Sequence, residues 1–546
     1  MKKLLAIVLA LAMVLPMVAG AYADVPALEE KDDQELYDEI LGEFYDLYME
    51  ALDCMDVDQR YALEAIAEAK MLQAGVLLPT TSNYGNYGIG RTVPKTANGT
   101  LWGNDSDRQY SILATKEIIK ATDRDALKAM WMEAADAATY ISEAKAYLAE
   151  NGYTLDDEYK YPSSADPQTW DVLNTYLQAD ARPLVQLYDG LMMYDLKNTQ
   201  QPALAESYEA NDDMTVFTFK IRQGVKWVDS QGREIGDVTA DDFVAGMQHM
   251  LDCQAGLEWL VDGVIEGASE YINSETTDFA DVGVKALDDY TLEYTLCDPT
   301  PYFLTMLSYS IFAPMNRSYF LSQGGAFGIE EFAAAKDSSN YKYGTSPDNI
   351  AYNGPFVVKS YTEANTIVFE ANPSYYNPDI LGVHTLTWKY DDGTDNTKTY
   401  KDMVAGDITN AGLNTATMEI AKADGLFDEY AYVSDTDATA FTEWMNVNRQ
   451  AYANFNDANV AVSTMTEDQK TLANAAMRNV HFRRAVMFSI DRATMVAQRK
   501  GEDLKYNSMI NAYVPGNFVY LSKEVTVDIN GESVTFPAGT AYGTIR

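Results

Sequence analysis

The chain has 546 residues and a formal net charge of −42. So acidic a protein is a poor partner for nucleic acid or for an anionic membrane surface, because both need clustered Lys and Arg. Apolar residues make up 47% of the sequence, which supports large packed cores and excludes global disorder. The length allows two to four domains.

The first residues have the pattern of a secretory signal peptide. Met1, Lys2 and Lys3 form a short basic start, 4–20 is an apolar run, and A-Y-A at 21–23 is a cleavage site. We therefore expect cleavage after Ala23 and an exported protein, in the periplasm or at the outer face of the cytoplasmic membrane. The alternative is an uncleaved membrane anchor. A cysteine for lipid attachment does not follow the apolar run.

The amino-terminal part of the mature chain has helical periodicity. Apolar residues recur at three- and four-residue spacing over 30–78, where 76–78 is expected to be a short buried strand. The Gly-, Thr- and Asn-rich stretch 80–103 is expected to be mostly loop. A second helix is expected over 121–150, ending at Asn151 and Gly152.

From Tyr159 onwards the pattern is mixed α and β. Thr239 is expected to cap a helix, with Asp242 at its third position. A single amphipathic helix is expected over 479–498, and a hairpin over 525–535 with an Asn530-Gly531 turn. Strands are predicted at 213–221, 289–296, 365–370 and 384–390.

No catalytic or metal-binding pattern is recognisable. The three histidines, His249, His384 and His481, show no metal-ligand spacing, and nucleophile, nucleotide and zinc-protease motifs are absent. The cysteines at 54, 253 and 297 form no C-x-x-C pair. D-D-G-T-D-N at 391–396 is interpreted as a solvated turn rather than a calcium loop. We therefore predict no catalytic residues, no metal and no cofactor, although a carboxylate pair for general acid/base chemistry could be hidden among 82 acidic residues.

A series of short motifs resembles the oligopeptide-binding proteins of ABC importers, family 5 of the extracellular solute-binding proteins. The motifs occur in the family's order between Tyr159 and about Pro515. They are D-P-Q-T-W-D at 166–171, L-Y-D-G-L at 187–191, P-A-L-A-E-S at 202–207, T-V-F-T-F-K-I-R at 215–222, G-V-K-W at 224–227, V-T-A-D-D-F at 238–243, Y-N-G-P-F at 352–356, N-P-S-Y-Y at 372–376, V-H-F-R-R-A at 480–485 and I-D-R at 490–492.

The resemblance implies a two-lobed α/β fold of the periplasmic-binding-protein type with an extra third domain. It implies capture of an oligopeptide between closing lobes, through the peptide backbone, and delivery to the permease subunits of an ABC transporter, with no enzymatic activity. A monomer is expected. The implied division is 1–23 signal peptide, 24–158 helical segment, 159–191 with 299–357 lobe I, 192–298 domain II, and 358–546 a partial lobe II.

Ligand-binding residues can be inferred from the family only where segments of this sequence match its motifs. The resemblance implies three groups facing the cleft: Tyr176, Leu177 and Gln178 after the first motif; Tyr352, Asn353 and Gly354 at the crossing to the second lobe; and Trp444 with Asn446 on a later strand. For each of them, packing or turn formation is the alternative role.

Two features depart from the family pattern. D-Q-R at 58–60, A-E-A-K-M-L at 67–72 and V-L-L-P at 76–79 resemble the family's carboxy-terminal end, although they stand near the amino terminus here. The family pattern continues beyond Arg546 with a large part of its second lobe, including the acidic residue that pairs with a bound peptide's amino terminus. A truncated second lobe is therefore expected. The alternatives are another solute on the same fold, such as a nickel complex, haem or an oligosaccharide; an exported acidic hydrolase; and a fragment without a ligand.

Overall fold

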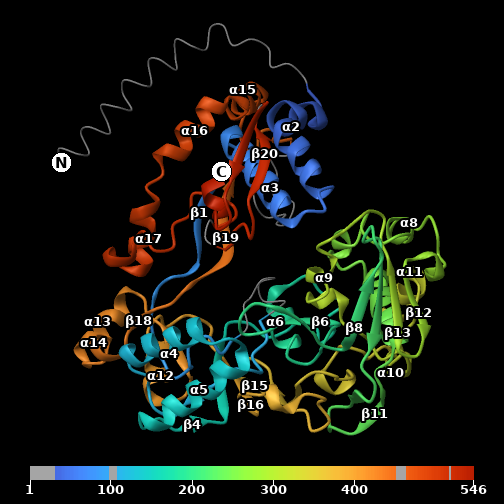
Figure 1. Ribbon diagram of the computed structural model, residues 1–546, viewed down its shortest axis with the longest axis vertical. Coiled ribbons are helices and arrows are strands. Elements are labelled where there is room, and N and C mark those ends of the chain that lie inside the picture. Colours follow the sequence, from blue (N-terminus) through green and yellow to red (C-terminus); the bar gives the residue numbers. More distant parts are fainter. Residues whose placement is uncertain (1–30, 98–106, 451–462, 516–517, 530, 546) are drawn as a thin grey trace.

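The computed structural model describes residues 31–97, 107–450, 463–515, 518–529 and 531–545. The expected signal peptide and residue Asn530 of the expected hairpin turn lie outside these ranges. Figure 1 shows two units joined by a pair of long strands. We call the smaller unit the head, the larger unit the body and the two strands the ribbon. The architecture is mixed α and β in two units, as the sequence predicts.

The ribbon consists of β1 (Leu77–Tyr84) and β19 (Thr436–Trp444), which pair in antiparallel fashion from Leu77 opposite Trp444 to Tyr84 opposite Thr436. β1 is longer than the expected strand at 76–78, and residues 80–84 are strand rather than loop. The reason is a partner strand some 360 positions further along the chain, which pairs with the polar residues Thr81 and Ser82. α17 (Arg492–Lys500) lies beside the ribbon (Figure 1).

The head combines residues from both ends of the sequence. Its helix α3 buries Ala62, Leu63, Ala65 and Ile66 in one apolar cluster with side chains of the carboxy-terminal hairpin. The head elements are α2 (Asp33–Leu52), α3 (Val57–Ala74), α15 (Glu467–Arg478), α16 (Val480–Ser489), β20 (Val525–Ile529), β21 (Glu532–Phe536) and α18 (Tyr542–Ile545). The hairpin β20–β21 is confirmed.

The end of α3 shows how α3 and α16, from opposite ends of the sequence, fit together. Gly75 ends the helix with a left-handed backbone, φ +68°, that glycine adopts without strain. The buried guanidinium of Arg483, from α16, donates to the carbonyl oxygens of Gly75 and Ala74. It thereby satisfies helix-end acceptors that would otherwise be left without partners.

The body is built around two four-stranded sheets. One has the order β14-β15-β16-β5, with β5 parallel to β16, and the other the antiparallel order β12-β13-β9-β8. The strands are β5 (Glu158–Ser163), β8 (Ala205–Ala210), β9 (Val216–Ile221), β12 (Val284–Asp288), β13 (Thr291–Thr295), β14 (Phe356–Thr362), β15 (Thr366–Ala371) and β16 (Thr385–Tyr390). The strands predicted at 213–221, 289–296, 365–370 and 384–390 are thus confirmed.

Smaller sheets and helices complete the body. The shorter strands are β2 (Tyr87–Gly90), β3 (Ala114–Thr115), β4 (Leu155–Asp156), β6 (Met192–Tyr194), β7 (Gln200–Pro202), β10 (Lys226–Val228), β11 (Glu234–Asp237), β17 (Asn410–Gly412) and β18 (Tyr432–Val433). The helices are α4 (Ala121–Glu133), α5 (Ala137–Glu150), α6 (Gln178–Leu184), α7 (Ala240–Cys253), α8 (Ala268–Ile272), α9 (Phe303–Met306), α10 (Arg317–Ser322), α11 (Ile329–Lys336), α12 (Lys398–Ala405), α13 (Thr415–Ala423) and α14 (Phe427–Tyr430).

Two helices that were expected to be continuous are each divided. The stretch 121–150 breaks between α4 and α5, where Asp136 accepts a hydrogen bond from the Thr139 amide and starts a new helix. The stretch 479–498 breaks after Ser489, and Asp491 caps α17 in the same way. As expected, Thr239 caps α7 and Asp242 stands at its third position, and in the structure the two form a capping box. In both corrections a capping aspartate interrupts an apolar pattern that continues across the break.

The expected start of the second lobe at 358 falls inside β14, and β14 belongs to the same sheet as β5. One continuous apolar core also spans the body from Tyr110 to Trp388, and so includes the stretch expected as domain II. We therefore propose a division into the body (85–97 and 107–435), the ribbon, and the head. Arg60 of α3 touches the body, with its guanidinium carbon 3.9 Å from the ring centre of Tyr302.

Candidate ligand-binding site

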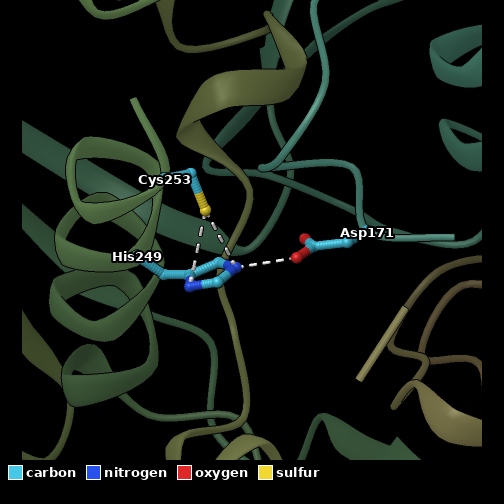
Figure 2. Close-up of side chains that lie close together, drawn as sticks. All are labelled: Asp171, His249 and Cys253. Carbon is cyan, nitrogen blue, oxygen red and sulfur yellow. Dashed lines mark hydrogen bonds and ion pairs between the residues drawn. The ribbon is translucent and has the colours of Figure 1, made fainter. Parts of the chain in front are cut away.

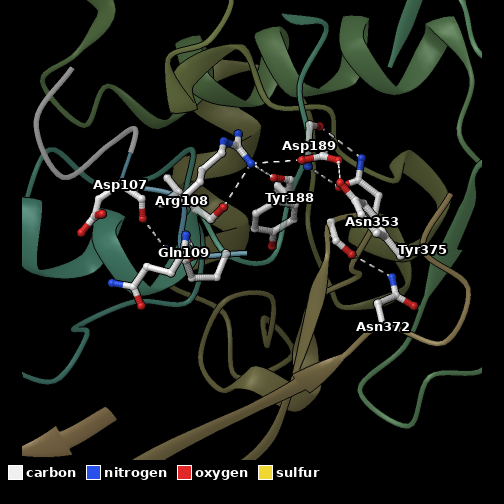
Figure 3. A network of polar contacts seen from close by, with 11 residues as sticks. Asp107, Arg108, Gln109, Tyr188, Asp189, Asn353, Asn372 and Tyr375 are labelled. Atoms are coloured by element: carbon white, nitrogen blue, oxygen red, sulfur yellow. Dashed lines mark hydrogen bonds and ion pairs between the residues drawn. The ribbon is translucent and has the colours of Figure 1, made fainter. Parts of the chain in front are cut away.

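Motifs of the body that resemble the family meet in one buried polar network, centred on Asp189 (Figure 3). Its carboxylate accepts hydrogen bonds from Arg108, 3.1 Å away, and from the Tyr375 hydroxyl, 2.7 Å away. Burial raises the pKa of Asp189, while the Arg108 charge and the Tyr375 hydroxyl oppose that rise. A buried carboxylate with this many partners fixes the position of the segments around it.

The expected ligand residues Tyr352, Asn353 and Gly354 belong to this network or its surroundings. Tyr352 is fully buried and its backbone bridges to Val228. The Asn353 amide exchanges hydrogen bonds of 3.2 and 3.3 Å with the backbone of Asp189. A side chain on Gly354 would lie 2.5 Å from backbone atoms of residues 187 and 188. Burial leaves no surface through which a ligand could touch these three residues in this structure.

Residues 107–109, which follow the amino-terminal motifs at 58–79, complete the same network. Besides the Arg108 contact, the Gln109 amide donates to Gln186 at 2.8 Å, and the Gln186 side chain donates to the Asp107 carbonyl at 2.6 Å. Sequence reasoning missed these residues because they carry no motif of their own. They show that this amino-terminal segment packs into the body as well as into the head.

Tyr176 and Leu177 line a cavity of 470 Å³. Tyr176 is 66% exposed, and residues of the segment 341–345 also line the cavity. Asp180, at the start of α6, holds the loop in place: its carboxylate accepts from the Gln168 amide at 2.6 Å and from the Thr175 hydroxyl at 2.7 Å. An exposed aromatic ring on a fixed loop is suited to contact a ligand.

Gln178 is also exposed but lines a different cavity, of 320 Å³, together with Tyr161, Arg182 and Trp388. The structure therefore separates it from Tyr176 and Leu177, because it is the first residue of α6 and points to another side of the loop.

A larger groove, of 750 Å³, follows the ribbon. Phe441 and Glu443 of β19 line it, together with Arg499 and Met495 of α17 and residues 80–84 of β1. In the described part of the chain β19 pairs only with β1, so its other edge carries no partner strand. Glu443 and Arg499 form no ion pair with any residue that the structure describes. Glu443 is the acidic residue among those lining the groove, and Arg492, Arg499 and Lys500 are the basic ones.

Trp444 and Asn446 lie where the ribbon enters the head. Trp444 is 60% exposed and its ring centre is 6.3 Å from that of Tyr513. The Asn446 side chain accepts from the Asn448 amide at 3.0 Å and so stabilises a turn. Neither residue lines the groove, because Trp444 follows Glu443 on the strand and points to its other face.

The three histidines differ in their surroundings. His481 is exposed, and His384 is exposed and paired with Asp157 at 2.6 Å. His249 is fully buried beside Asp171 and Cys253. The i, i+4 spacing of His249 and Cys253 could have signalled this cluster, but Asp171 lies on a distant segment.

Comparison with known proteins places these features in a family. A model described as the bacterial extracellular solute-binding proteins, family 5 Middle, matches residues 199–530, more than half of the chain. The oligopeptide-binding protein AmiA of Streptococcus pneumoniae is 32% identical over 371 residues, which cover 68% of this chain and 53% of AmiA. The oligopeptide-binding protein SarA of Streptococcus gordonii is 30% identical over 67% of this chain and 52% of SarA.

Matches over shorter stretches are also found. The periplasmic oligopeptide-binding protein OppA of Escherichia coli is 34% identical over 37% of this chain and 33% of OppA. Among solved structures, peptide-bound OppA of Listeria monocytogenes has a TM-score of 0.42 and 24% identity, and covers 49% of this chain and 48% of its own. This chain spans about half the length of AmiA and of SarA.

Proposed function

Because this chain belongs to the bacterial extracellular solute-binding proteins of family 5, we propose that it binds oligopeptides outside the cytoplasm and delivers them to the permease of an ABC importer. The names of the relatives AmiA, SarA and OppA support the ligand class. No helix in the described part of the chain has the length and apolar character needed to cross a bilayer.

The observation that carries the proposal is the groove along the ribbon, which is lined by β1, β19 and α17. An extended peptide can lie in this groove beside the strands, so that its backbone provides affinity whatever its side chains. Phe441 offers an apolar contact. Glu443 and Arg499 are suited to bind the amino and carboxyl termini of the peptide, respectively.

We propose binding without chemical conversion and action as a monomer. The family consists of solute-binding proteins. Tyr176 and Leu177 would form a second contact surface for the peptide if the head and the body close around the ribbon and bring the two residues toward the groove. Such a hinge motion is typical of binding proteins built of two units.

The first test is a series of thermal melts on the chain from Asp24 onwards, with pools of short peptides, oligosaccharides, nickel and haem. A ligand that binds only the folded state at a hundredfold excess over its Kd stabilises that state by about 2.7 kcal/mol, and so raises Tm. We expect peptides alone to raise it. A shift with an oligosaccharide, nickel or haem, and none with peptides, overturns the peptide assignment.

The second test probes the termini. With a peptide identified in the melts, Glu443→Gln is expected to weaken binding about tenfold, and acetylating the peptide amino terminus is expected to abolish the difference between variant and wild type. Arg499→Gln should behave likewise with carboxyl-amidated peptides. Glu532→Gln, an exposed glutamate on β21, serves as the matched control and should bind as the wild type does. Equal losses with free and blocked peptides contradict the assigned roles.

A further inference from the structure

Three side chains that the proposed function does not use converge inside the body (Figure 2). His249 and Cys253 stand one turn apart on the same face of α7, and Asp171 reaches them from the loop before α6. The His249 Nε2 lies 2.7 Å from Asp171 Oδ2 and 3.4 Å from Cys253 Sγ. The three ligand atoms all lie within 4.8 Å of one another.

The cluster lies against aromatic rings in the core of the body, and Cys253 is half-buried. His249 is fully buried and Asp171 is 2% exposed. Rings of Phe320 and Phe332 lie 4.5 and 5.0 Å from the imidazole. Asp171 Oδ1 accepts from the Leu173 amide at 3.2 Å, which directs Oδ2 toward His249. Charged groups in such a place need direct compensation.

The geometry does not fit a nucleophilic Cys-His-Asp relay. A relay places the nucleophile on one imidazole nitrogen and the carboxylate on the other. Here the carboxylate contacts Nε2, and the thiol is also nearer to Nε2 than to Nδ1, at 3.4 against 3.7 Å. Burial also raises the pKa of the Cys253 thiol, which opposes its activation as a nucleophile.

We propose that Asp171, His249 and Cys253 bind one Zn²⁺ ion. Thiolate, imidazole and carboxylate together are a donor set that zinc accepts, while the thiolate disfavours calcium and magnesium. Binding releases the proton of the Cys253 thiol. The thiolate and the Asp171 carboxylate then neutralise both charges of the ion, so that the buried site carries no net charge.

Zinc coordination requires only a small change in the distances between the donor atoms. In a tetrahedral zinc site with bonds of about 2.0 to 2.3 Å, neighbouring donor atoms lie roughly 3.3 to 3.6 Å apart. The Sγ to Nε2 distance already matches this range. The Nε2 to Oδ2 distance of 2.7 Å must open by roughly half an ångström, within reach of a rotation about the Asp171 side chain.

Tyr341 provides a candidate for the fourth position. Its hydroxyl oxygen is buried and has no hydrogen-bond partner among the residues that the structure describes. Its ring centre is 5.9 Å from that of Phe332, and the Phe332 ring centre is in turn 5.0 Å from that of His249.

The site would stabilise the loop that presents Tyr176. Tyr341 and Gly344 line the cavity beside Tyr176, and a side chain on Gly344 would lie 2.6 Å from the Asp171 Cβ. A zinc ion would therefore join α7, the loop ending at Asp171 and the segment 341–344 below the cavity.

Cobalt titration tests the proposal. The full chain is freed of metal with a chelator and titrated with Co²⁺, which occupies zinc sites and gives a thiolate-to-cobalt charge-transfer absorption. We expect one bound ion per chain, this absorption, and its loss when Zn²⁺ is added. The absence of the absorption in the wild-type protein overturns the proposal.

Variants locate the ion. Cys253→Ser is a one-atom change and should abolish the absorption and weaken Zn²⁺ binding about tenfold or more. Cys297→Ser, which alters an exposed cysteine, is the matched control and should keep both. Asp171→Asn provides a second variant that keeps the thiol, and a cooperative melt verifies the fold of each. An absorption that persists in Cys253→Ser places the ion elsewhere. The readout involves no peptide, so it is independent of the proposed function.

Discussion

At the scale of single residues, the buried carboxylate of Asp242 makes the stability of the fold depend on pH. Its carboxylate accepts from the Trp227 indole at 3.0 Å and from the Thr239 amide at 2.8 Å. Burial raises its pKa from 3.8 to about 6, and these hydrogen bonds only partly oppose the rise. The folded state therefore binds this proton more tightly than the unfolded state does.

The sign of the pH dependence follows from that difference. Protonation of Asp242 favours the folded state, so the contribution is fully present below about pH 4 and is lost as pH rises through 6. The loss is on the order of 2–3 kcal/mol. Asp242→Asn keeps an acceptor oxygen and removes the titration. We expect its free energy of unfolding to rise relative to the wild type between pH 4 and 6, in urea unfolding at each pH. A difference that does not vary with pH contradicts this.

Motif residues could be recognised from the sequence, but not their contacts. Asn353 and Gly354 were identified by a motif whose chemistry suits both a turn and a ligand site. Only the fold shows that Asn353 pairs with the backbone of Asp189. Tyr176 and Leu177 are expected to face a ligand cleft because they follow the first family motif. The structure places them at a cavity that residues of the distant segment 341–345 also line, and no motif predicts that segment.

At the scale of elements, the division of 479–498 into α16 and α17 illustrates what periodicity overlooks. The apolar spacing continues through Ile490, but Asp491 caps a new helix, as Asn479 caps α16. The Asn479 side chain accepts from the amides of His481 at 2.9 Å and Phe482 at 3.3 Å. Capping side chains thus determine boundaries that a hydrophobic pattern alone does not reveal.

The cap at Asn479 can be tested directly. Asn479→Ala removes the acceptor and should lower the free energy of unfolding by about 1 kcal/mol, whereas Asn479→Ser retains a capping oxygen and should cost a few tenths at most. Chemical denaturation of the three proteins measures both values. Equal losses in the two variants would falsify a capping role.

At the scale of the whole molecule, the head depends on residues from distant parts of the sequence. Ile66 is 5% exposed and belongs to one apolar cluster with Val525, Val527 and Ile545. The sequence predicts the helix and the hairpin separately. It does not predict that they pack together, because an apolar face does not specify its partner.

Because Ile66 packs within the head cluster, we expect its substitution to affect the head and not the body. Ile66→Ala should destabilise the head by about 2–5 kcal/mol through lost contacts and a cavity. Hydrogen exchange should become faster in β20 and β21 and stay unchanged in β9 of the body. Val57→Ala, on the same helix at a position 47% exposed, is the control and should change the stability by less than about 0.5 kcal/mol. Faster exchange throughout the body would contradict an independent head.

The join between α3 and β20 also determines the order in which the protein can be assembled. Residues 57–74 leave the ribosome long before residues 525–529 are synthesised. The apolar face of α3 therefore stays without its partner, β20, through most of the synthesis of the chain. Contacts between residues this far apart in sequence form slowly. An apolar face that is exposed until then can cause aggregation. The body, whose core is formed by residues 110–388, can fold in that interval, and the head can close only as the last step.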